Sequence, residues 1–258
     1  MPRPLEFTRA IVRRPGASVV SGLRAGGGPD PDFARVCAEH AAYCAALEAA
    51  GLALTVLEPC EDYPDALFVE DPALVFPEAA ILLRPGAPSR SGEAALLRPV
   101  LEGEFAQVLE LPEGYADGGD VLVLGERVLI GLSARTDRAG AAALAELLAG
   151  LGRAAEVVET PPSVLHLKTA SSLVDEETVL ATADLAATGV FAGSRVLIVP
   201  DGEEAGANIL RVNDTILAGA GFSRLLDLLD GHGATVVPLE NAAIARIDAG
   251  FTCMSLRW

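Results

Sequence analysis

The chain has 258 residues, of which 51% are hydrophobic, and a formal net charge of -17. The apolar content suffices for a large core, and we expect one domain over residues 1–258. The acidic balance argues against nucleic acid and anionic membranes as partners, because both require a basic surface. No apolar run approaches the roughly 20 residues of a membrane span. The first residues lack an apolar signal core, and the spacing of the four cysteines suggests no disulfide framework, so we expect a cytoplasmic protein.

The predicted elements alternate between strands and helices along the whole chain. A strand over 8–12, a helix over 32–50 and a strand over 52–57 come first. Four later segments each join two apolar strands by a short polar turn, which predicts a hairpin. These hairpins cover residues 73–83, 121–132, 172–181 and 209–218. Helices are predicted after three of them, over 92–101, 137–151 and 223–229, with further strands at 156–158 and 235–237.

The hairpin units repeat every roughly 35 to 50 residues, which is the range of propeller-like arrays. A fifth unit can be assembled from the two ends of the chain, by pairing the strand at 8–12 with a tail strand around Cys253. Such pairing would close a ring of five blades and leave no exposed sheet edge. The pattern therefore predicts an α/β propeller with both termini in one blade. The alternative is an ordinary open α/β sheet.

Polar residues gather just before or at the start of each predicted hairpin. They are Asp65, Glu70, Asp71, Asp117, Asp120, His166, Lys168, Glu203, Glu204, Asn208 and, in the tail, Cys253. Pseudo-symmetric blades would bring these positions together at one end of the axis. The expected result is a pocket with a thiol, an imidazole and several carboxylates.

That set of groups has a chemical logic. A thiolate is a strong nucleophile, and a histidine can protonate a leaving group and then activate water. The carboxylates would grip a planar cation such as a guanidinium, which in turn favours the thiolate. Each group also has a plainer interpretation. Cys253 can be a small buried hydrophobe, His166 a structural residue in an apolar strand, and the segment 117–120 only a turn.

Two further patterns receive structural interpretations. Cys37, His40 and Cys44 share one face of the first helix, which fits three metal ligands or a core stripe. We favour the core, because no fourth ligand has the usual spacing. The glycines at 26–28 lack a following Lys-Ser/Thr pair and are no phosphate loop. Together with residues 14–16 and 21–24 they predict a mobile lid.

Five motifs carry a resemblance to a known family: PDALFVEDP from Pro64, RPGAPSR from Arg84, IGLSART from Ile130, VLHLKT from Val164 and CMSLRW from Cys253. Through them nearly the whole chain resembles the dimethylarginine dimethylaminohydrolases of the guanidino-group-modifying, or pentein, superfamily. The resemblance implies a five-bladed α/β propeller that acts as a single catalytic domain. It also implies hydrolysis of methylated arginines to citrulline and a methylamine through a covalent cysteine intermediate. No cofactor and no metal are expected.

The resemblance also implies roles for individual residues. Cys253 would attack the guanidinium carbon, His166 would protonate the departing amine and activate water, and Asp117 would support His166. Family members often carry Glu at the position of Asp117, whose side chain is one methylene shorter. The implied substrate-binding residues are Asp71 for the guanidinium, Asp65 for the α-amino group, Arg90 and Arg135 for the α-carboxylate, and Leu23, Glu70 and Ile247 around them.

Arginine deiminases of the same superfamily have Asp two residues after the histidine, where this chain has Lys168. A dimethylated nitrogen has no N–H, so a carboxylate facing it would stay unpaired at a cost of about 1–3 kcal/mol. The lysine therefore favours a methylated substrate, provided that its ammonium points to the rim or to a carboxylate. The alternative is that Lys168 is simply an exposed residue of a strand, without a role in specificity.

Three functions stay open at this point: a methylarginine hydrolase, another guanidine hydrolase or transferase such as arginine deiminase, and a ring that only binds a cationic ligand. The expected partner is a small methylated arginine, and a homodimer is an alternative to a monomer. A soft metal such as zinc would inhibit by capturing the Cys253 thiolate.

Overall fold

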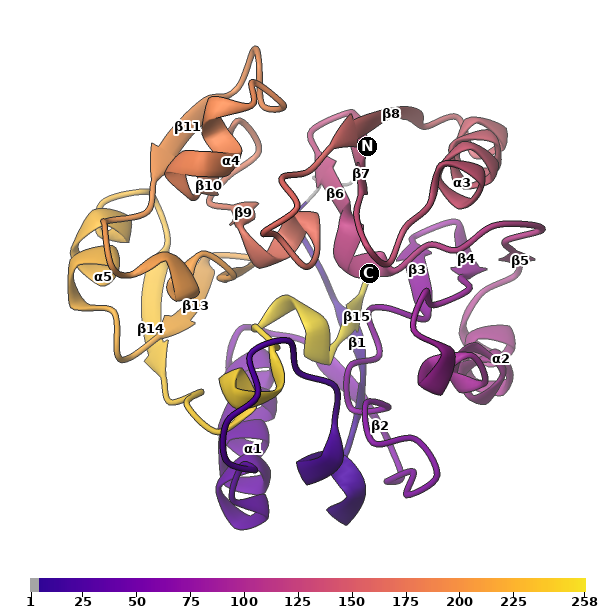
Figure 1. Cartoon of the computed structure of the whole chain (residues 1–258), viewed down its shortest axis with the longest axis horizontal. Helices are drawn as coiled ribbons and strands as arrows, with labels where there is room; N and C mark the ends of the chain where they lie inside the picture. The colour runs from indigo at the N-terminus through magenta and orange to yellow at the C-terminus, as the bar shows by residue number, and fades with distance from the viewer. Residues whose placement is uncertain (1–4) are drawn as a thin grey trace.

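The computed structural model describes residues 5–258, which form five three-stranded sheets arranged around a common centre (Figure 1). The sheets are β15-β1-β2, β3-β4-β5, β6-β7-β8, β9-β10-β11 and β12-β13-β14. The strand bounds are β1 Arg9–Arg13, β2 Ala53–Leu57, β3 Ala73–Phe76, β4 Ala79–Leu82, β5 Val108–Glu110, β6 Val121–Leu124, β7 Arg127–Leu132, β8 Ala154–Glu159, β9 Ser171–Leu173, β10 Thr178–Ala181, β11 Arg195–Ile198, β12 Leu210–Val212, β13 Thr215–Gly219, β14 Thr235–Leu239 and β15 Leu256–Arg257.

The helices lie on the outside of this arrangement (Figure 1). They are α1 Phe33–Ala49, α2 Glu93–Glu104, α3 Arg138–Gly150, α4 Ala183–Ala187 and α5 Ser223–Leu229. The first helix begins as its sequence predicts, because the Asp32 side chain accepts a hydrogen bond from the Arg35 N–H and caps the first turn. The short helix α4 was not predicted, since five residues are too few to show a helical period. No helix formed by residues 5–258 is long and apolar enough to cross a membrane.

Each of the four predicted hairpins is confirmed as an antiparallel pair, and a helix then returns the chain to a third strand parallel to the second. In the second unit, for example, Val121 pairs with Ile130, and Ile130 pairs on its other side with Val157. The repeated strand–strand–helix–strand order is why the five units resemble one another. The open-sheet alternative is wrong.

The fifth sheet is built from both ends of the chain, as predicted. Ala10 pairs antiparallel with Arg257 and parallel with Leu54. The indole of Trp258 also packs against the ring of Phe105, with 4.8 Å between the ring centroids. The C-terminal residues are therefore tied into the structure.

One local prediction, for Cys253, and one of the plainer interpretations, for His166, were wrong. Cys253 does not lie in the tail strand but in a 3₁₀ turn, Thr252–Met254, that precedes it. His166 does not lie in an apolar strand but directly before another 3₁₀ turn, Leu167–Thr169, at the entry to β9. In both cases strand pairing begins a few residues later than the apolar pattern suggests. The Cys253 and His166 side chains consequently lie at turns, outside the ladder hydrogen bonds.

Candidate active site

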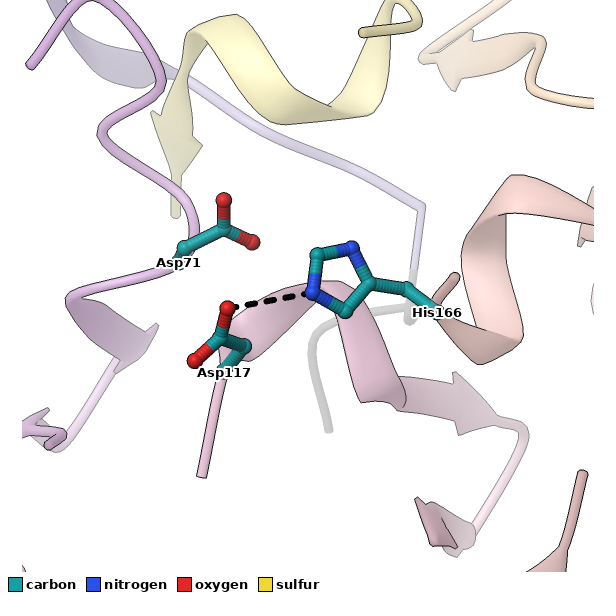
Figure 2. Close-up of side chains that lie close together, drawn as sticks. All are labelled: Asp71, Asp117 and His166. Atoms are coloured by element: carbon teal, nitrogen blue, oxygen red, sulfur yellow. Dashed lines mark hydrogen bonds and ion pairs between the residues drawn. The ribbon is translucent and has the colours of Figure 1, made fainter. Parts of the chain in front are cut away.

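Asp71, Asp117 and His166 come from three different units and meet at one point (Figure 2). One ligand atom from each lies within 4.8 Å of the others. All three side chains are buried, with 4%, 0% and 8% of their surface exposed. Each residue lies on the segment leading into a hairpin, which is where the repeat placed the polar positions.

Asp117 reaches His166 even though its side chain is short. Its Oδ2 lies 3.1 Å from His166 Nε2 (Figure 2). Its Oδ1 accepts a hydrogen bond from the Gly86 N–H at 2.7 Å. The backbone N–H of Asp117 donates to Thr136 Oγ1 at 3.1 Å, which fixes the residue from behind. One carboxylate oxygen of Asp117 is thus held by the backbone, and the other contacts the imidazole.

Asp71 is held on both of its carboxylate oxygens. Oδ1 accepts a hydrogen bond from the Gly119 N–H at 3.1 Å, and Oδ2 forms an ion pair with Arg90. Gly119 is required here by close approach. A Cβ at that position would lie 2.8 Å from His166 Cγ and 3.0 Å from Asp71 Oδ1. The Gly-Gly pair of the sequence is therefore more than a turn, because it allows the imidazole and the carboxylate to converge.

The charges around His166 favour its protonated form. Burial alone would lower the pKa of His166. The nearby Asp71 carboxylate, the hydrogen bond to Asp117 and the charge of Asp120 raise it to about 9. The imidazole therefore carries a proton at neutral pH and is ready to act as an acid.

Asp120 supports this arrangement without a place in the predicted catalytic set. Its Oδ1 accepts from the Leu167 N–H at 2.9 Å, and its Oδ2 accepts from Ser133 and Thr136 hydroxyls at 2.6 and 2.7 Å. It thereby links the turn that carries His166 to the hairpin of the second unit. In the sequence, the only sign of this role is that Asp120 follows Asp117 by three residues, at the start of the same hairpin.

Cys253 adjoins the cluster through its backbone and through charge. Its carbonyl accepts a hydrogen bond from the Glu70 N–H at 3.1 Å, and its side chain is partly buried. Burial, together with the negative charges of Glu70 and Asp71, raises the pKa of the Cys253 thiol to about 12. The thiol is therefore protonated at rest.

Lys168 is buried against a carboxylate. Its Nζ lies 2.6 Å from Glu70 Oε1, and both side chains are about nine-tenths buried or more. Arg257 lies 3.2 Å from the same oxygen, and the Thr252 hydroxyl donates to Glu70 Oε2 at 2.7 Å. The interpretation of Lys168 as an exposed strand residue is wrong. The Glu70 network instead anchors the turn that carries Cys253.

A cavity of about 840 Å³ lies against this network. Its lining includes Glu70, Lys168, Thr252 and Arg257, together with hairpin turns such as 76–78. Neither Cys253 nor the His166 cluster is among its lining residues. The Glu70 network therefore lines this cavity, while the cluster of Asp71, Asp117 and His166 lies outside its lining.

The predicted binding residues surround the cluster in different ways. Asp65 is buried and its Oδ1 accepts from the Leu23 N–H at 2.9 Å. Ile247 is also buried and lies behind Gly22, whose Cβ would be 3.5 Å from Ile247 Cγ2. The segment at 21–24 thus packs over Asp65, while its expected mobility stays a prediction.

The two predicted carboxylate-binding arginines differ. Arg135 is partly exposed and close enough to Asp65 for its charge to act on the pKa of that carboxyl, which burial raises. Arg90 is 3% exposed and already bridges Asp71 and Glu93. Of the two, only Arg135 presents a side chain toward solvent.

Two other sequence candidates lie elsewhere. Glu203 accepts hydrogen bonds from the Arg224 and Leu225 N–H groups at 3.2 and 2.7 Å and so stabilises the start of α5. The Cys44 Sγ lies 3.7 Å from His40 Nε2 on the inner face of α1, and burial lowers the pKa of His40 to about 4. These contacts fit the predicted core stripe.

Comparison with known proteins gives a consistent result. Residues 55–217 match the family model described as arginine deiminase. The chain is 33% identical over 254 residues to N(G),N(G)-dimethylarginine dimethylaminohydrolase of Pseudomonas aeruginosa, covering 98% of this chain and 100% of the relative. A second relative of that name, from Streptomyces coelicolor, is 33% identical over 262 residues, with 96% of each chain covered.

Solved structures extend the comparison. The Pseudomonas aeruginosa enzyme, as a Cys-to-Ser mutant complexed with citrulline, superposes with a TM-score of 0.95 at 32% identity, covering 98% of this chain and 100% of that one. A His-to-Gly variant of a dimethylarginine dimethylaminohydrolase, solved as an adduct with S-methyl-L-thiocitrulline, gives 0.94 at 32% identity, with the same coverage. The N-terminal domain of a cyanobacterial arginine dihydrolase gives 0.84 at 18% identity over 96% of this chain and 97% of that one, which shows a shared fold.

Proposed function

The chain belongs to the dimethylarginine dimethylaminohydrolase family and has its pentein fold, and we propose that it hydrolyses methylated arginines to citrulline and a methylamine. The observation that carries the proposal is the convergence of Asp71, Asp117 and a protonated His166 beside the turn of Cys253. Residues 1–258 would act as one catalytic domain on a small-molecule substrate.

The reaction begins with a neutral thiol that needs activation. The carboxylates of Glu70 and Asp71 oppose loss of its proton. A substrate guanidinium that enters the site offsets those charges and lowers the pKa of Cys253, because an adjacent cation favours the thiolate. The proton leaves to water, since His166 is already protonated. Substrate binding and nucleophile formation are thus one event.

Formation of the covalent intermediate uses the Cys253 thiolate as the nucleophile and the protonated His166 as the acid. The Cys253 thiolate attacks the guanidinium carbon, and a tetrahedral adduct forms. His166 then transfers its proton to the methylated nitrogen, the carbon–nitrogen bond breaks, and the methylamine departs. The product of this half-reaction is an S-alkylthiouronium on Cys253.

Hydrolysis returns the site to its starting state. The now neutral His166 takes a proton from water as the water oxygen attacks the thiouronium carbon. The carbon–sulfur bond breaks, the hydroxyl proton of the tetrahedral adduct passes to the departing Cys253 sulfur, and neutral citrulline forms. Asp117 stabilises the imidazolium at both stages through its contact with Nε2.

We assign the recognition of the substrate to the residues around this centre. Asp71 would hold the guanidinium, Asp65 the α-amino group and Arg135 the α-carboxylate. Arg90 has one Nη1 N–H beyond its described contacts, which can serve a substrate oxygen. Leu23 and Ile247 would cover the bound chain, and Glu70 would act through its charge and its hold on the Cys253 turn.

The pairing of Lys168 with Glu70 supports a methylated substrate over free arginine. The position two residues after His166 presents an ammonium directed at Glu70, so no carboxylate at this position is left unpaired against a dimethylated nitrogen. A hydrogen-bonding group left unmet there would cost about 1–3 kcal/mol. The site therefore tolerates methyl groups where a carboxylate would reject them.

The four cysteines are free thiols, which fits a cytoplasmic location, and the net charge of -17 fits the absence of nucleic acid partners. A homodimer stays a prediction.

Citrulline release is the direct test. The protein is supplied separately with L-arginine, monomethylarginine and asymmetric dimethylarginine. We expect citrulline from the methylated substrates, no turnover by the Cys253→Ser variant, and a mass adduct on Cys253 in quenched wild-type reactions. Citrulline from L-arginine alone would refute the proposal in favour of a deiminase, and ligand binding without any citrulline would indicate a binding protein.

A further inference from the structure

The Arg90 guanidinium is held between two buried carboxylates, and one of them, Glu93, lies outside the predicted site. Glu93 is the first residue of α2, three residues after Arg90. Arg90 Nε lies 3.0 Å from each Glu93 oxygen, and Arg90 Nη2 donates to Oε2 at 2.7 Å. Only 2% of Glu93 is exposed. This is a close two-point contact on one edge of the guanidinium.

The remaining contacts fix the guanidinium in one orientation. Nη2 also donates to the carbonyls of Phe68 at 3.0 Å and Asp65 at 3.2 Å. Nη1 forms the ion pair with Asp71. Because the guanidinium is a rigid planar fork, the partners of Nε and Nη2 determine where Nη1 points. Glu93 therefore sets the geometry of the Arg90–Asp71 contact from the far side.

Glu93 also changes the charge balance of the site. Arg90 paired with Asp71 alone would form a neutral pair, in which Asp71 offers little net charge to a substrate cation. When Glu93 is ionised, two carboxylates share one guanidinium, and one net negative charge remains on this cluster. Burial raises the pKa of Glu93 to about 7 although Arg90 opposes this, so that the charge is fully present only above about pH 7; such perturbed groups cluster at functional sites.

We propose that Glu93 is a positioning residue of the substrate site, which acts through Arg90 to orient Asp71 and to leave its charge available for the substrate guanidinium. The inference rests on the proposed function and extends it to a residue that does not touch the substrate. It predicts an effect on substrate affinity larger than the effect on the chemical step.

The test measures binding and turnover separately. Binding of asymmetric dimethylarginine is measured by calorimetry in a Cys253→Ser background, and kcat and KM are measured in the active protein. Glu93→Gln keeps the size of the side chain and removes its charge. Because charge-assisted hydrogen bonds are the strong ones, we expect about 10-fold weaker binding, a similar rise in KM and a smaller change in kcat.

Glu104→Gln is the matched control. It removes one negative charge from the last turn of the same helix, where Glu104 pairs with Arg9. We expect binding within about 2-fold of wild type, since the described partner of Glu104 is Arg9 and not a residue of the Arg90 cluster. Equal affinities for the two variants, with both folded by circular dichroism, would overturn the inference.

A double-mutant cycle separates positioning from a general structural role. If Glu93 acts only through Arg90, adding Glu93→Gln to Arg90→Gln, which removes the cation, should weaken binding no further than Arg90→Gln alone. Additive losses would overturn the inference.

Should Glu93→Gln fail to fold, Glu93→Asp replaces it. The Asp side chain keeps the charge but is one methylene shorter. It should bind about 3-fold more weakly, and wild-type affinity would overturn the inference.

The binding assay also keeps the two proposals distinguishable. If the wild type binds asymmetric dimethylarginine or L-arginine but releases no citrulline from the methylated substrate, the proposed hydrolysis fails and the Glu93 test still applies. If citrulline appears while Glu93→Gln binds as tightly as wild type, only the inference about Glu93 fails.

Discussion

Replacement of Asp117 by Asn tests the basis for the proton on His166. The substitution keeps the shape of the side chain and removes the charge 3.1 Å from His166 Nε2. A hydrogen bond to a charged group contributes about 1.5–3 kcal/mol, which corresponds to about 1–2 pKa units. The pKa of His166 should therefore fall from about 9 to between about 7 and 8.

The sign of the effect follows from the role of the protonated imidazole. In the wild type the fraction of His166 that is protonated stays high up to pH of about 9 and falls above it. In Asp117→Asn the protonated fraction should begin to fall about 1–2 pH units lower. The decline of kcat at alkaline pH should therefore also begin about 1–2 pH units lower than in the wild type. The Asn amide also presents a donor to Nε2–H, and we expect kcat at neutral pH to fall by about 10- to 100-fold.

The assay is a histidine titration by NMR alongside the pH profile of kcat. Asp117→Glu serves as the control, because it keeps the charge and introduces the residue that family members often carry. It should retain a His166 pKa near that of the wild type. The reasoning is refuted if Asp117→Asn, correctly folded, leaves both the His166 titration and the alkaline limb where they are in the wild type.

Three further predictions test other parts of the site. Gly119→Ala places a Cβ 2.8 Å from His166 Cγ, and overpacking of about 1–3 kcal/mol should displace the ring and lower kcat about 10-fold or more with an unchanged fold, measured by kinetics and circular dichroism. A retained kcat would contradict it. Alkylation of Cys253 by iodoacetamide in the free protein should accelerate continuously as pH rises toward about 12, and a plateau below pH 8 would argue against a protonated resting thiol. Glu70→Gln should lower the free energy of unfolding in urea by about 3–5 kcal/mol, because Lys168 loses its buried partner, and Glu70→Gln with Lys168→Met should restore part of it; no recovery would refute the pairing as the cause.

The fold could be predicted well because its information is local and repeated. The hairpin at 121–132 and its following helix each show their own period, and the same pattern returns in the other units. The pairing of the N-terminal strand with the tail followed from the need to complete the ring. At Cys253, and in the plainer interpretation of His166, apolar neighbours suggested strands, although Cys253 lies on a 3₁₀ turn and His166 directly before one. Apolar character marks burial but does not separate a turn at the centre of a ring from a strand.

The site could be predicted only in part, for a different reason. Residue types and hairpin positions identified Asp71, Asp117 and His166 as neighbours, which the geometry supports. The partners of Arg90 could not be derived, because its orientation depends on contacts with α2 and with two backbone carbonyls. The destination of the Lys168 side chain likewise depends on Glu70, a residue almost 100 positions earlier in the chain. Pairings of this kind follow from tertiary packing and leave no periodic signal.

The pKa values of the two proposed reacting groups give the site a built-in selectivity. A thiol with a pKa of about 12 and an imidazole with a pKa of about 9 stay in their protonated forms in water, because the carboxylates stabilise the cationic imidazole and oppose the thiolate. Only a ligand with its own positive charge can offset these carboxylates next to Cys253. Citrulline, a neutral urea, has the shape of the substrate but lacks this charge. The product therefore cannot generate the nucleophile that would attack it, and the same carboxylates that bind the substrate make the covalent step directional.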